Sequence, residues 1–127
     1  MFVELYNVKN DEYYKYYLMI CSIYFGDINN GIKYYNEIMN NLHLVKKGLI
    51  ITYNFTYNPK IIEYNFALAL ITNKFVEEAK VHLNLLMKLA TNGDFSNDKD
   101  VTRIMMVELI DKIILDEEER MTFYKKI

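Results

Sequence analysis

The sequence predicts an all-α fold built mainly from antiparallel helix hairpins, and three observations point to it. The 127 residues include one proline and four glycines, too few for a turn-rich β fold. Apolar residues recur at three- and four-residue steps through most of the chain, which is the period of one helix face. Short polar turns separate these periodic segments. We therefore expect about six helices in a single domain, residues 1–127.

The first hairpin is expected over about residues 11–47. Its opening helix runs to about Phe25, and Gly26 ends it because glycine adopts a left-handed conformation at no steric cost. Asp27 or Asn29 can cap the second helix. The side chains expected to face inward from this second helix are Ile28, Ile32, Tyr35, Ile38, Met39 and Leu42.

The opening helix of this hairpin is aromatic or apolar around most of its circumference. Tyrosines recur along it at three- and four-residue steps, and apolar residues fill a neighbouring stripe. We therefore expect this helix to be packed on two sides. Cys21 is the only cysteine, so it cannot form an intrachain disulfide. Because it lies in an apolar run, we expect a buried, inert thiol.

The sequence of residues 49–57 does not distinguish between a strand and a helix. In ITYNFTYN, which begins at Ile51, large apolar residues alternate with polar ones, the period of a strand. Leu49, Ile50, Tyr53 and Tyr57 also form a helical stripe, and helical surroundings can override strand propensity. A short extended segment and a helix are both compatible with this pattern. Residues 1–9 are ambiguous in the same way.

The second hairpin is expected over about residues 58–91. Asn58 followed by Pro59 is a strong helix start, a capping residue before proline at the first helical position. A short turn at Asn73 and Lys74 separates its two helices. The side chains expected to face inward from the second of these helices are Ala79, Leu83, Leu86 and Ala90.

Two further helices are expected over about residues 99–127, where they would cap the hairpins. The first runs from about Lys99 to Leu115. The second begins after Asp116, which forms a capping-box pattern with Glu119 three residues later. The apolar residues at helical spacing on the first of these helices are Val101, Ile104, Met105, Leu109 and Ile113.

Two stretches resemble a known repeat family. GDINNGIKYYNEIM, residues 26–39, resembles the turn and second helix of a tetratricopeptide repeat, and YNFALAL through Ala79 is similar to a nearly whole unit. The resemblance covers about residues 13–90 as two degenerate units. Met19 replaces the small residue usual in the first helix, Gly31 replaces an alanine, and no proline closes either unit. Gly31 and Ala79 are also 48 residues apart, where contiguous repeats would give about 34.

The resemblance implies stacked hairpins with a concave surface lined by the first helix of each unit. The candidate partner groove would consist of Tyr13, Tyr16, Ile20, Tyr24, Tyr64, Leu68 and Ile71. Such a groove would bind an apolar or extended peptide. The alternative is that these residues pack against neighbouring helices or a second subunit. Because about three repeats are needed for stability, we also expect a homodimer.

Two hypotheses of function follow. The first is a protein- or peptide-binding helical-repeat module, for example the sensory or dimerising part of a bacterial regulator. The second is a small inhibitor or immunity-type protein that acts through an acidic surface at residues 92–119, which carry nine acidic and three basic residues. A net charge of −2 argues against direct binding of nucleic acid.

No pattern indicates catalysis, a cofactor or a metal, so we expect a protein that is not an enzyme. His43 and His82 stand alone on helices, where surface or packing roles are usual. The Asp94–Asp100 loop has alternating oxygen ligands but lacks the glycine and closing glutamate of a calcium loop. No run approaches the roughly 18 apolar residues that span a bilayer, and the N-terminal residues lack the pattern of a signal peptide. We expect a soluble, cytoplasmic protein.

Overall fold

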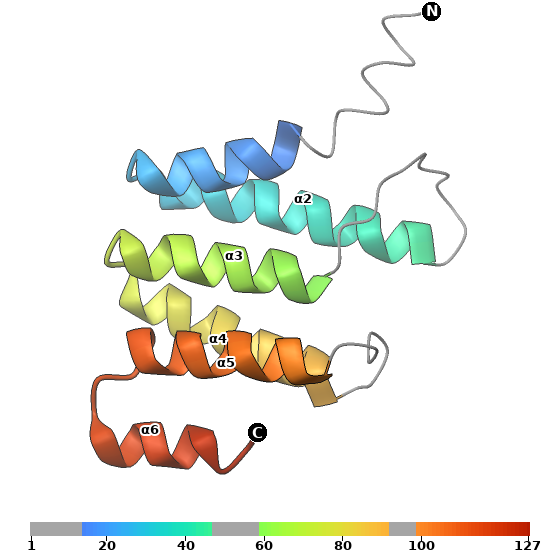
Figure 1. Cartoon of the computed structure of the whole chain (residues 1–127). Helices are drawn as coiled ribbons and strands as arrows, with labels where there is room; N and C mark the ends of the chain where they lie inside the picture. The colour runs from blue at the N-terminus through green and yellow to red at the C-terminus, as the bar shows by residue number, and fades with distance from the viewer. Residues whose placement is uncertain (1–13, 47–58, 92–98) are drawn as a thin grey trace, which may run out of the picture. The chain divides into compact units, whose positions relative to one another are not determined.

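The computed structural model of this protein describes residues 14–46, 59–91 and 99–127, and these are helical with short connections (Figure 1). A helix over residues 14–24 comes first. It is followed by α2 (Ile28–Lys46), α3 (Pro59–Thr72), α4 (Val76–Thr91), α5 (Lys99–Ile113) and α6 (Glu117–Tyr124). No strand occurs in these three described ranges. The prediction of an all-α fold made of helix hairpins is confirmed.

The chain divides into two compact units, Met1–Tyr57 and Asn58–Ile127. The boundary falls between the two predicted hairpins. The ambiguous segments, residues 1–9 and 49–57, lie outside the described residues.

In the first unit, the helix over 14–24 packs closely against α2 at Gly31. Met19 and Ile23 are completely buried, as is Ile38 of α2. Gly31 of α2 lies against this set: a Cβ atom there would overlap Ile23 Cδ1 and would lie 3.5 Å from the carbonyl oxygen of Met19. The crossing of these two helices therefore depends on the missing side chain at Gly31.

The same turn ends the first helix of both hairpins. After the helix over 14–24, Gly26 has a φ of 83°, its N–H donates to Ile23 O, and the next N–H, that of Asp27, donates to Ser22 O. These two bonds form a Schellman motif, in which a left-handed residue allows two late carbonyls of the helix to be satisfied.

The turn after α3 repeats this pattern 48 residues later. Lys74 has a φ of 68° and donates to Ile71 O, while Phe75 donates to Leu70 O. The helices that follow the two turns, α2 and α4, begin at Ile28 and Val76, again 48 residues apart. The offset between Gly31 and Ala79 is thus a property of the backbone as well as of the sequence.

In the second unit, α3 packs against α4, α5 packs against both, and α6 packs against α5 (Figure 1). The predicted inward residues Ala79, Leu83 and Leu86 are all fully buried. The predicted helix start at Asp116 is confirmed, because Asp116 caps α6 by accepting a hydrogen bond of 2.9 Å from the Glu119 N–H. The other buried apolar side chains of this unit are Ile62, Phe66, Ala67, Ala69, Leu70, Met106, Leu109, Ile110, Ile113, Ile114 and Phe123.

One burial prediction is wrong. Cys21 is exposed, because it is two residues from both Met19 and Ile23 and so projects from the opposite side of their helix. Ile104 is 67% exposed, because the buried stripe of α5 runs through Met106, Leu109 and other residues offset from it. Within the described residues, no helix combines the length and apolar character needed to cross a membrane.

Candidate binding surface

The predicted groove residues that the structure describes lie on two helices. Tyr16, Ile20 and Tyr24 are on the helix over 14–24, where the first two are half-buried and Tyr24 is 56% exposed. Tyr13 lies outside the described residues. The remaining residues, Tyr64, Leu68 and Ile71, are half-buried on α3. These two sets belong to different units, and each is described within its own unit.

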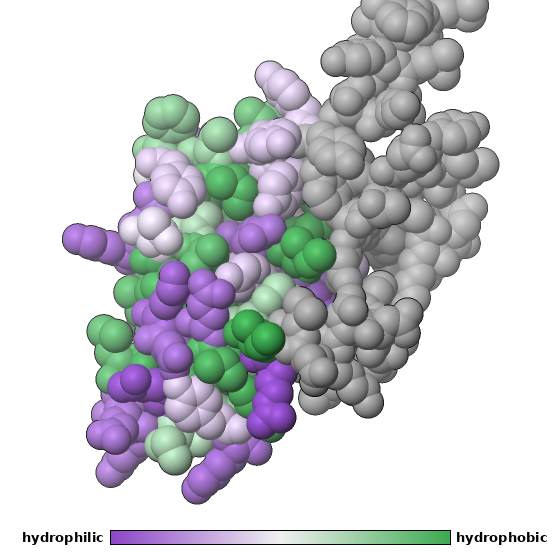
Figure 2. Space-filling model, viewed as in Figure 1, coloured by the Kyte–Doolittle hydropathy of each residue, from purple (hydrophilic) through white to green (hydrophobic). Residues whose placement is uncertain are grey.

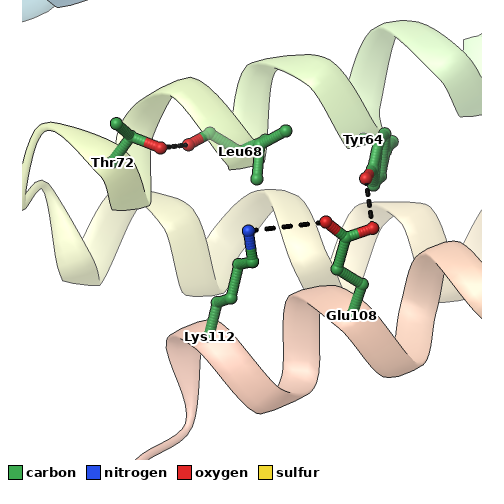
Figure 3. Close-up of polar contacts among 5 residues, drawn as sticks. All are labelled: Tyr64, Leu68, Thr72, Glu108 and Lys112. Atoms are coloured by element: carbon green, nitrogen blue, oxygen red, sulfur yellow. Dashed lines mark hydrogen bonds and ion pairs between the residues drawn. The ribbon is translucent and has the colours of Figure 1, made fainter.

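On α3, Tyr64 contributes to a polar contact that sequence analysis did not identify. Its hydroxyl donates a hydrogen bond to Glu108 Oε2 of α5, 44 residues further along the chain (Figure 3). Glu108 Oε1 lies 3.4 Å from Lys112 Nζ, one helical turn away on α5. Leu68 points from α3 toward the same side chains in Figure 3. This contact joins α3, the first helix of the second hairpin, to α5, the helix that follows that hairpin.

The charge states of this contact follow from its geometry. The hydrogen bond from Tyr64 lowers the pKa of Glu108, burial opposes this effect, and Lys112 adds to the lowering. Burial raises the pKa of Tyr64 to about 12, and the hydrogen bond to Glu108 and its charge act in the same direction. At neutral pH a protonated phenol therefore donates to an ionised carboxylate, which is a charge-assisted bond. This bond restricts the orientation of the Tyr64 ring.

An exposed apolar residue lies beside this polar contact. Ile104 is one helical turn before Glu108 on α5, so their side chains share a helix face. The surface formed by Tyr64, Leu68, Ile71, Ile104, Glu108 and Lys112 is called the α3–α5 face below. Figure 2 shows hydrophobic and hydrophilic residues interspersed over α5 and α6 instead of sorted into separate areas. A mixture of this kind is also found in protein interfaces, which as a whole are about as apolar as the rest of a protein surface.

A buried ionisable pair connects α3 to α4. Glu63 is 1% exposed and His82 4% exposed, and Glu63 Oε2 lies 2.8 Å from His82 Nδ1. The His82 ring packs edge-on against Phe66 at 4.7 Å between ring centres. Burial raises the pKa of Glu63, and the hydrogen bond and charge of His82 partly offset the rise. The pair therefore lies in the buried contact between α3 and α4.

The sequence predicted a surface or packing role for His82 and no carboxylate partner, whereas the structure buries it beside Glu63. A signal was available, because Glu63 precedes the buried Phe66, Ala67 and Leu70 by three, four and seven residues. That spacing puts Glu63 on the inward stripe of α3. A buried carboxylate requires a partner, and a histidine on the adjacent helix is a suitable one.

The structure describes residues 99–119 of the acidic region at 92–119. Asp116, Glu117, Glu118 and Glu119 are all exposed, and Asp116 acts as the cap of α6. Glu119 lies 3.9 Å from Lys80 of α4, a surface ion pair of small energetic weight. The loop considered for calcium falls largely outside the described residues.

Among the residues that the structure describes, no group of three or more His, Cys, Asp or Glu side chains could hold a metal ion. The sequence matches no protein-family model, and no curated protein or solved structure is significantly similar to it.

Proposed function

We propose that this protein is a tetratricopeptide-like helical-repeat module that binds a segment of another polypeptide along the α3–α5 face. The observation that carries the proposal is the contact of Tyr64 with Glu108, which joins α3 to α5 beside the exposed Ile104. In helical-repeat proteins, stacked hairpins create extended binding surfaces from one helix of each repeat. The repeated turns after residues 24 and 72 support the repeat character of the chain.

The chemistry of the face indicates the class of partner. Ile104, Leu68 and the Tyr64 ring offer apolar contact, while Glu108 retains acceptor capacity for N–H donors. Glu108 and Lys112 compensate each other in charge, so neither a strongly acidic nor a strongly basic partner is favoured. We therefore expect an extended or apolar peptide whose backbone N–H groups reach Glu108. Because Tyr64 is already oriented by its hydrogen bond, less side-chain freedom would be lost on binding.

A peptide-display selection tests this proposal. Peptides selected on the full chain would be measured for affinity to the wild type, to Ile104→Asp and to Val81→Asp. Val81 is 51% exposed on α4, outside the α3–α5 face, and is therefore a matched control for an added surface charge. We expect Ile104→Asp to weaken binding at least about tenfold, as for loss of an interface residue worth about 1.4 kcal/mol or more, and Val81→Asp to leave it unchanged. If both variants bind the selected peptides as well as the wild type, the α3–α5 face is not the binding site.

The alternative, an inhibitor acting through its acidic surface, is favoured by the four consecutive exposed carboxylates at 116–119. Its binding would weaken steeply with added salt because exposed charges are screened. It would also be lost in a Glu117→Lys, Glu118→Lys variant. Peptide binding on the α3–α5 face would respond to neither change. The assignment to a sensory part of a bacterial regulator, and to the cytoplasm, rests on the family resemblance and on the single cysteine.

A further inference from the structure

The helix over residues 14–24 has one packed side and one uncovered aromatic side. Met19 and Ile23 are 0% exposed on the packed side. The opposite side carries five residues at helical spacing, here called the tyrosine stripe: Tyr14, Tyr17, Cys21, Tyr24 and Phe25. Its aromatic members are 67%, 63%, 56% and 88% exposed, in that order, and Cys21 is exposed as well. The stripe points away from α2, because it is opposite the residues that α2 buries.

The composition of this stripe is unlike that of a solvated helix face. It holds no charged residue, whereas the outward faces of α4 and α5 carry Glu77, Lys88 and Lys112. Aromatic residues are enriched and charged residues depleted at the cores of protein interfaces. Tyr17 is moreover held by an edge-on contact with the Tyr16 ring at 5.9 Å between ring centres. A rigid tyrosine loses little conformational freedom when it is covered.

We propose that the tyrosine stripe pairs two copies of this chain in a symmetric dimer. The residues 14, 17, 21 and 24 follow the 3-4-3 spacing of a helix-pairing seam, which another helix of the same spacing complements. Because the stripe is uncharged, superposing it on its own copy brings no like charges together. A twofold interface uses the same patch on both subunits, and Cys21 lies near the middle of this one.

The area of the stripe is sufficient for such a dimer. An aromatic side chain offers about 200 Å², so exposures of 56–88% on four rings leave roughly 500 Å² uncovered on one copy. Two copies would together cover roughly 1,000 Å², which reaches the size expected of a specific interface, about 1,000 Å² or more. This dimer is independent of the α3–α5 face, since its residues all belong to the first unit.

The test combines sedimentation with crosslinking of the full chain. Cys21 is the only cysteine, so any disulfide or short bismaleimide link must join two copies. We expect a concentration-dependent dimer by analytical ultracentrifugation and a covalent dimer under mild oxidation. Tyr17→Lys should raise the dissociation constant of the dimer at least about thirtyfold, as for loss of one strong interface residue, and should suppress the crosslink although Cys21 is retained.

Val81→Lys, which adds the same charge at an exposed apolar site on α4, should change neither result. Circular dichroism of both variants checks that the helices are intact. A protein that sediments as a monomer at every concentration tested would overturn the proposal. So would a dimer that Tyr17→Lys leaves equally tight, because its interface would then lie elsewhere.

Discussion

Replacing Lys74 by glycine should stabilise the protein. Lys74 ends α3 with a φ of 68°, a left-handed conformation that costs a residue with a Cβ atom about 1–2 kcal/mol. Glycine avoids this cost but gains conformational freedom in the unfolded chain, worth about 0.4–1 kcal/mol. The net expectation for Lys74→Gly is therefore a gain of roughly 0.5–1 kcal/mol in the free energy of unfolding.

The equivalent turn in the first hairpin provides the reciprocal change. Gly26 has a φ of 83°, and a Cβ atom placed there meets nothing within 4 Å. Gly26→Lys should therefore lose a similar amount, roughly 0.5–1 kcal/mol, through backbone conformation alone and without steric overlap. The hydrogen-bond pattern is the same in the two turns. The two substitutions therefore compare lysine with glycine in the same backbone arrangement.

Urea unfolding followed by circular dichroism would measure both changes, as shifts of the midpoint at constant slope. Lys74→Ala is the control, because it removes the lysine side chain but retains a Cβ atom in the left-handed conformation. If Lys74→Ala stabilised the protein as much as Lys74→Gly, the gain would come from losing the lysine side chain, and the conformational argument would be refuted.

Three further predictions concern the cores of the two units. Gly31→Ala should destabilise despite a helix-propensity gain of about 1 kcal/mol, because its Cβ atom overlaps Ile23 Cδ1. Ile23→Val removes that atom, so a double-mutant cycle by urea unfolding should give a favourable coupling of about 1 kcal/mol or more; simple additivity would contradict the close approach. Thr102→Val should stabilise by about 1 kcal/mol in the same assay, because the buried Thr102 hydroxyl has no hydrogen-bond partner among the residues that the structure describes; a loss of stability would mean that the hydroxyl is satisfied. The pKa of Glu63 is raised in the folded protein above its ordinary value of 4.5. Its contribution to the free energy of unfolding is therefore greatest below about pH 4.5 and is lost as pH rises through the folded-state pKa. The free energy of unfolding of Glu63→Gln should therefore fall less than that of the wild type as pH rises through this range. If the two pH profiles were parallel, the titration of Glu63 would not be the cause of the pH dependence.

The helix boundaries were predictable because local chemistry determines them. Gly26, Asp27, Pro59 and Asp116 each satisfy or remove a backbone group at a helix end, and each stands at a boundary in the structure. These effects act over three or four residues, so the sequence alone contains them.

The inward face of the most apolar helices was harder to predict. When nearly every position is apolar or aromatic, periodicity no longer distinguishes the packed side, which is why Cys21 was expected to be buried. A related ambiguity holds for α5, where two apolar stripes overlap and the one that contains Ile104 is exposed. The contact between Tyr64 and Glu108 depends on how α3 and α5 pack, and no local pattern encodes that arrangement.

The buried pair of Glu63 and His82 has a consequence for the alignment of α3 and α4. The buried apolar side chains of α4 are Ala79, Leu83 and Leu86, spaced four and three residues apart, so a slide of α4 along α3 by one turn would again place apolar residues in apolar contact. Such a slip would separate the carboxylate from the imidazole and leave both unpaired in an apolar environment, at a cost of several kcal/mol. We infer that this pair selects one register among otherwise near-equivalent ones. A Glu63→Leu, His82→Leu variant should keep its helices but show doubled or broadened amide resonances, and a single sharp set would show that leucine packing alone selects the register.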